Sequence, residues 1–126
     1  MTERRTVTIV TADHGQVTIP EPVWCLGRHQ GGGACVDITH VGAEHALTLP
    51  TRRGPAVHLI TALEARPYVT DSFLRGPFVG IEIGGDWHEI GLAGLERMAS
   101  ELEAHAEQLR ERARELAVAL TEGGPR

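Results

Sequence analysis

The chain has 126 residues, of which 41% are hydrophobic and only 4% aromatic, and this suits one domain with an aliphatic core. Its formal net charge of −5 argues against nucleic-acid binding, because phosphate recognition normally requires a basic surface. The sequence contains no lysine, which excludes Schiff-base chemistry and the lysine of a phosphate-binding loop.

The N-terminal segment, MTERRTVTIV, lacks the apolar run of a secretory signal. No stretch of the chain approaches the roughly 20 apolar residues that a membrane span requires. We therefore expect a cytoplasmic protein with no membrane partner. In a reducing cytosol, a disulfide between Cys25 and Cys35 is less expected than a metal site or two free thiols.

The first predicted element is a β-hairpin over residues 5–20. Apolar and polar residues alternate in both of its halves, so Val7 and Ile9 share one face. Val17 and Ile19 share a face in the returning half. Turn residues separate the two halves, as a hairpin requires.

Residues 21–45 form a glycine-rich segment without periodicity, which we interpret as a metal-binding loop. It contains both cysteines of the chain and three of its seven histidines. Thiolate and imidazole are the ligands that tetrahedral zinc prefers, and the glycine run at 31–33 lets the chain reverse sharply. The four predicted zinc ligands follow the pattern C-x3-H-x5-C-x4-H and are Cys25, His29, Cys35 and His40. His45 is the alternative fourth ligand.

Two further residues support this interpretation. Trp24 could shield the site from solvent, and Asp37 could orient a ligand histidine. A histidine-rich surface loop with free thiols is the alternative to a structural metal site, and a catalytic metal is a third possibility.

The same loop carries the motif P-x-W-C-x3-H followed by D-x2-H-x-G. Its residues are Pro22, Trp24, Cys25, His29, Asp37, His40 and Gly42. With the strand pair and helix that follow, the motif resembles a small actinobacterial, Streptomyces-type domain family of unassigned function. The resemblance implies metal ligation by Cys25, His29 and His40. It also implies a cysteine directly before the proline, where this chain has Glu21. Either Glu21 replaces that cysteine as an oxygen ligand, or Cys35 takes its place, or the site is degraded.

Residues 46–90 are predicted to form further strands. A short strand covers residues 45–51, and a longer one covers 56–65, with Val57, Leu59 and Leu63 facing inward. A short helix over 61–66 is the alternative there, and the proline-containing segment 67–77 is expected to be loop. The last two strands, 78–83 and 87–90, flank the turn Gly84-Gly85-Asp86.

The last element, over residues 91–121, is predicted to be one long helix. Its apolar residues recur at an uninterrupted heptad spacing. They are Leu92, Leu95, Ala99, Leu102, Ala106, Leu109, Ala113, Leu116 and Leu120. About 29 residues at ~1.5 Å each span roughly 43 Å, longer than a compact domain of this size. We therefore expect helix-to-helix pairing with a second copy as a coiled coil. A helix that bends, or breaks near His105, and packs within the chain is the alternative.

Together these features predict an α+β fold: an antiparallel sheet of about five strands, a zinc-binding loop and one long C-terminal helix. The function that we expect is a non-enzymatic zinc-binding interaction or regulatory module. It would be homodimeric, with a further protein partner that the sequence does not identify. The alternatives are a zinc-dependent hydrolase with three protein ligands and a water, a redox-sensing cysteine pair and a nucleic-acid-binding finger.

Overall fold

The computed structural model describes residues 5–123. These residues divide into two compact units, of which the first ends at Ile90 and the second begins at Gly91. The predicted α+β class is confirmed, with antiparallel sheets and one long C-terminal helix. No helix among residues 5–123 is long and apolar enough to cross a membrane.

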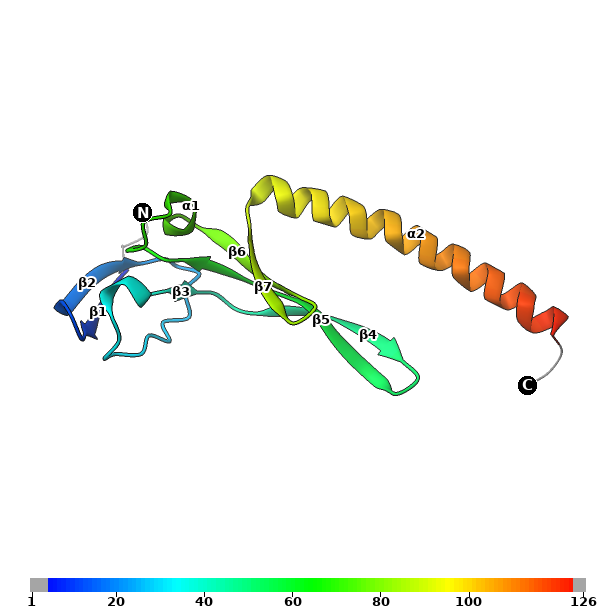
Figure 1. The fold of residues 1–126 in the computed structure, drawn as a ribbon, viewed down its shortest axis with the longest axis horizontal. Coiled ribbons are helices and arrows are strands. Elements are labelled where there is room, and N and C mark those ends of the chain that lie inside the picture. Colours follow the sequence, from blue (N-terminus) through cyan, green and yellow to red (C-terminus); the bar gives the residue numbers. More distant parts are fainter. Residues whose placement is uncertain (1–4, 124–126) are drawn as a thin grey trace. The chain divides into compact units, whose positions relative to one another are not determined.

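The N-terminal hairpin consists of β1 (Arg5–Thr11) and β2 (Gly15–Glu21) and forms a two-stranded sheet of its own. The predicted faces are confirmed, because Ile9 and Ile19 are buried together in one apolar cluster. The 3-10 helix η1 (Cys35–Asp37) supplies Cys35 to this cluster, and Ile38 follows directly. Figure 1 shows the blue hairpin and the cyan η1 lying side by side.

The second sheet has five antiparallel strands built around one long strand, β5 (Gly54–Ala65). The other four strands are β3 (His40–Val41), β4 (His45–Thr51), β6 (Phe78–Ile83) and β7 (Asp86–Ile90). Both β3 and β4 pair with β5, at its C-terminal and N-terminal parts respectively. The predicted turn between β6 and β7 forms where Gly84 and Gly85 have φ values of 62° and 92°.

The predicted inward face of β5 is wrong. Val57 and Leu63 are 57% and 41% exposed, whereas Ala62 is buried. The physical reason is a β-bulge, at which the pairing with β4 shifts register between His45 and Leu47. Leu59 adopts a left-handed φ of 51° there, and the extra residue in β5 puts Val57 and Leu63 on opposite faces, so the predicted residues cannot share one inward face.

Two helices complete the fold. The short α1 (Ser72–Arg75) lies within the segment that was expected to be loop, and the Asp71 carboxylate caps it by accepting a hydrogen bond from the Phe73 backbone N–H. The long α2 (Leu92–Glu122) is continuous, so the alternative of a break near His105 is contradicted.

Candidate metal centre

The first residue of the site, Glu21, is the last residue of β2. It lies two positions beyond Ile19 and four beyond Val17, on the face of the strand that packs into the core. This alternation buries its carboxylate, and the residue is only 7% exposed. A buried carboxylate requires charged or hydrogen-bonding partners, and those partners come from the loop that follows.

Cys25 is positioned by a tight turn directly after β2. Its backbone N–H donates to the Pro22 carbonyl over 3.0 Å, and the next N–H, of Leu26, donates to the Val41 carbonyl in β3 over 2.9 Å. The Arg5 guanidinium also donates to the Cys25 carbonyl over 3.1 Å. The turn thereby aims the buried thiol at Glu21, and the Gly27 N–H donates to its sulfur over 3.4 Å.

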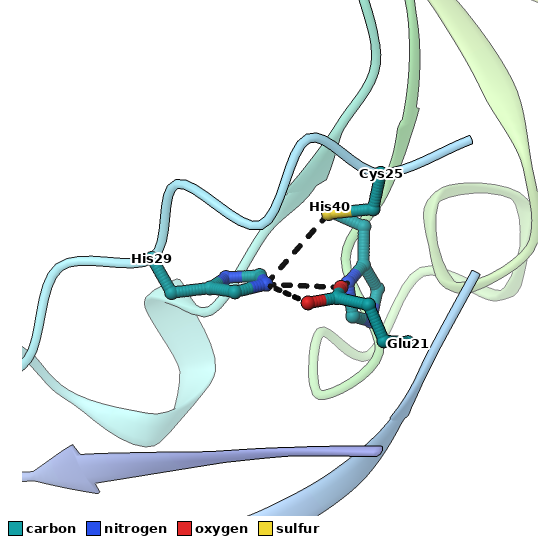
Figure 2. Close-up of side chains that lie close together, drawn as sticks. All are labelled: Glu21, Cys25, His29 and His40. Atoms are coloured by element: carbon teal, nitrogen blue, oxygen red, sulfur yellow. Dashed lines mark hydrogen bonds and ion pairs between the residues drawn. The ribbon is translucent and has the colours of Figure 1, made fainter. Parts of the chain in front are cut away.

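The two histidines reach the same carboxylate from different segments. Nε2 of His29, in the irregular loop, lies 2.9 Å from Glu21 Oε2 and 3.7 Å from Cys25 Sγ. Nδ1 of His40, the first residue of β3, lies 2.7 Å from Glu21 Oε1. Their rings meet edge to face with centroids 5.4 Å apart. Figure 2 shows the sulfur, both rings and the carboxylate pointing toward one another.

The four donor atoms lie within 4.8 Å of one another, close enough for one ion. Tetrahedral zinc holds its ligand atoms about 3.3–3.8 Å apart, and the separation of 3.7 Å between Cys25 Sγ and His29 Nε2 falls in this range. The carboxylate lies closer to both imidazoles, at hydrogen-bond distances that a bound cation would replace. One sulfur, two imidazole nitrogens and one carboxylate oxygen therefore lie close enough together to bind one metal ion.

The charges within the group favour an ionised carboxylate. Burial raises the pKa of the Glu21 carboxyl, but hydrogen bonds with the thiol and both imidazoles outweigh it and hold this pKa below its ordinary value. Burial raises the pKa of the Cys25 thiol, and so does the hydrogen bond to Glu21. A divalent cation would reverse this effect at the sulfur, because a coordinating thiol is deprotonated.

Cys35 does not join this group. Cys35 is only 7% exposed and belongs to the apolar cluster of Ile9, Ile19 and Ile38. Its backbone N–H donates to Asp13 Oδ1 over 2.8 Å. The fourth member of the group is Glu21, one of the alternatives to Cys35 that the resemblance allowed. Both cysteines are free thiols, in separate surroundings.

The other expected participants are also placed by the structure. His45 is exposed in β4 and pairs with Thr61, outside the group. Asp37 is exposed in η1, and the carboxylate that contacts both histidines is that of Glu21. Trp24 is half-buried, and its ring lies 6.4 Å from that of His40 between centroids, at an interplanar angle of 84°.

A cavity of about 460 Å³ opens beside the group. Cys25 and His29 form part of its wall, together with Arg28 and Glu44. The group is therefore buried but adjacent to a space that solvent and small molecules can enter.

Comparison with known proteins places the chain in a family. No curated protein and no solved structure matches it. A family described as a domain of unknown function, DUF6907, matches residues 6–118, which include the hairpin, the four donor residues and most of α2. The chain therefore belongs to the DUF6907 family.

Proposed function

We propose that this protein is a zinc-binding module in which Glu21, Cys25, His29 and His40 hold the ion. The observation that carries the proposal is the convergence of these four donors from β2, the following loop and β3. A thiolate and two imidazoles favour zinc over the hard cations calcium and magnesium, which prefer oxygen ligands. The motif from Pro22 to Gly42, which resembles actinobacterial sequences, would then be a metal signature within the family.

The ion's proposed role is structural. Between Glu21 and β3 the chain forms no regular element except the three residues of η1, and most of its side chains are exposed. Such a segment buries too little apolar surface to order itself, so the binding energy of the ion would act as folding energy. Four protein donors fill a tetrahedral shell, which supports a non-enzymatic role. Free thiols suit a reducing, cytoplasmic environment.

The proposed module acts as a homodimer through α2, with a further protein partner still to be found. The seam of α2 supports this, because Leu102, Leu109 and Leu116 are 44%, 56% and 53% exposed. An exposed leucine seam of this length is an association surface.

The two cysteines provide a matched test of the metal site. Cys25→Ala removes a proposed ligand, and we expect its zinc content to fall from one ion per chain to nearly none under dialysis. Cys35→Ala removes a buried thiol of the same kind from the apolar cluster and should keep its zinc, although the cavity lowers stability by about 1–2 kcal/mol. Zinc bound equally by both variants, or by neither the parent nor Cys35→Ala, contradicts the assignment.

The cavity beside Cys25 and His29 favours one second candidate, a zinc-dependent hydrolase. In that function Glu21 would release the ion, and water would take the fourth place. X-ray absorption of the zinc-loaded protein separates the two candidates. Loss of one oxygen ligand in Glu21→Gln without replacement by water supports the structural site, whereas a water ligand already present in the parent supports the hydrolase.

A further inference from the structure

The two apolar heptad positions of the long helix α2 differ in the size of their side chains. One seam position is filled by the small residues Ala99, Ala106 and Ala113. The other is filled by Leu95, Leu102, Leu109 and Leu116. The division holds from Leu95 to Leu116, whereas Leu92 and Leu120, near the two ends of the helix, occupy the alanine position. The relative direction of two such helices decides how these residues meet.

In a parallel pair, each seam position faces the same position of the partner. Layers of two alanines would then alternate with layers of two leucines. The leucine layers would hold the helix axes apart, and the alanine layers between them would leave voids. In an antiparallel pair, each alanine faces a leucine, so all of these layers have similar volume and interdigitate at one interaxial distance.

We propose that α2 associates with a second copy of itself in the antiparallel direction, with Ala106 opposite the partner's Leu109. This inference rests on the proposed self-association and specifies its geometry. In this register Ala99 also faces the partner's Leu116, and Ala113 faces the partner's Leu102. The symmetry axis passes between Glu107 and Gln108, next to the midpoint of the helix, so the two helices overlap along their whole length.

Charge complementarity selects this register. Glu103 and Arg110 flank the seam on the same side, and the antiparallel arrangement brings Glu103 next to the partner's Arg110, twice per dimer. A shift of one heptad in one direction brings Glu103 against the partner's Glu103, although it also brings Glu96 next to the partner's Arg110, and a shift in the other direction brings Arg110 against the partner's Arg110. In a parallel pair these two residues face Met98 and His105 of the partner subunit, which offer them no opposite charge.

A charge swap tests the geometry in the full-length, zinc-loaded protein. Within one chain, residues 103 and 110 are seven apart and separated by about 10 Å, so they do not contact each other. Any coupling between them therefore arises between chains. We expect Glu103→Arg and Arg110→Glu each to raise the dimer dissociation constant about tenfold, because each replaces two attractive pairs by repulsive ones. The double variant should return to within about threefold of the parent.

Arg110 also pairs with Glu107 in its own helix, over 2.9 Å. Helix content measured by circular dichroism for all four proteins therefore accompanies the dissociation constants, which come from analytical ultracentrifugation. A second variant, Ala106→Leu, gives an independent readout. It overpacks the layer with the partner's Leu109 and should weaken an antiparallel dimer, whereas it fills the alanine layer of a parallel dimer and tightens it.

The outcomes separate this inference from the function on which it rests. A parent dimer with no rescue in the double variant, or one tightened by Ala106→Leu, overturns the antiparallel geometry and leaves self-association intact. A parent chain that stays monomeric at ~100 μM overturns both the geometry and the dimer. The zinc content of the same sample then tests the metal site on its own.

Discussion

At the scale of single residues, Glu21 is the centre of the candidate metal site. It contacts both histidines at 2.7–3.0 Å and is among the most buried charged side chains that the structure describes. Its neighbours supply nitrogen and sulfur, and its carboxylate supplies the negative charge that a divalent cation needs beside one thiolate.

Glu21→Gln keeps the size of the side chain and removes its charge. We expect zinc affinity to fall by roughly 10- to 100-fold, because a neutral amide oxygen is a weaker ligand for a divalent cation than a carboxylate. Competition with a chromophoric chelator measures the change. Glu44→Gln, in the wall of the adjacent cavity, is the control, and an equal loss in both variants would show that Glu21 is not a ligand.

Part of this site could be predicted from the sequence. The cysteine and histidine spacing indicated Cys25, His29 and His40, but it treated Cys35 as equivalent to Cys25. The distinguishing signal is the alternation of β2, which continues from Val17 and Ile19 to Glu21 and predicts an acidic side chain on the apolar face. The position of Cys35 under the hairpin depends on how the loop folds back, and local spacing does not determine that.

Glu64 in β5 provides a test of pH dependence away from the metal site. Burial raises the pKa of its carboxyl above 4.5, Glu89 adds to the effect, and Arg66 opposes it. The folded protein therefore holds this proton more tightly than the unfolded chain. The stability that the group contributes is present below pH 4.5 and is lost as the pH rises through the folded-state pKa.

Glu64→Gln removes this titration. The stability of the variant relative to that of the parent, measured as the difference in the free energy of unfolding, should increase as the pH rises from 4 toward 7. Urea unfolding at several pH values measures the difference. A constant difference between the two proteins across this range would show that burial of Glu64 does not disfavour its charged form.

At the scale of elements, the sequence predicted the strand β5 but not the bulge within it. Alternation identified the strand, and the glycine pair identified the last hairpin. The bulge at Leu59 has no local signal, because leucine is uncommon at a positive φ and only the pairing with β4 imposes it. The separation of the hairpin into its own sheet likewise depends on contacts distant in sequence.

The left-handed backbone at Leu59 predicts an inverted preference between alanine and glycine. Both Leu59→Ala and Leu59→Gly lose the half-buried leucine, so their difference isolates the backbone. Glycine should be more stable than alanine by about 1 kcal/mol, because alanine keeps the left-handed penalty. At Val57, an exposed position of the same strand, alanine should be more stable than glycine by roughly 0.5–1 kcal/mol. Chemical denaturation of the four variants measures both differences, and the same order at both sites would contradict the bulge.

At the scale of the whole molecule, the two proposed sources of stability, metal binding and helix association, belong to two different units. The candidate metal centre belongs to the unit that ends at Ile90, and the leucine seam belongs to the unit that begins at Gly91. No residue of α2 is buried among those that the structure describes. Under the proposed function, the helix would gain its stability from association, which depends on protein concentration, and the loop would gain its stability from an ion, which depends on free zinc.

This separation predicts two independent thermal transitions in the full-length protein. Trp24, edge-on to His40, reports on the metal loop by fluorescence once Trp87 is replaced by phenylalanine, and far-ultraviolet circular dichroism reports mainly on α2.

Removal of zinc present at about 100 times its Kd costs about 2.7 kcal/mol and should lower the Trp24 midpoint by roughly 10–20 °C. It should leave the helix midpoint unchanged. Dilution should lower the helix midpoint and leave the Trp24 midpoint in place. If chelation and dilution shift both signals together, the two units unfold as one cooperative system, and neither source of stability acts on its own unit alone.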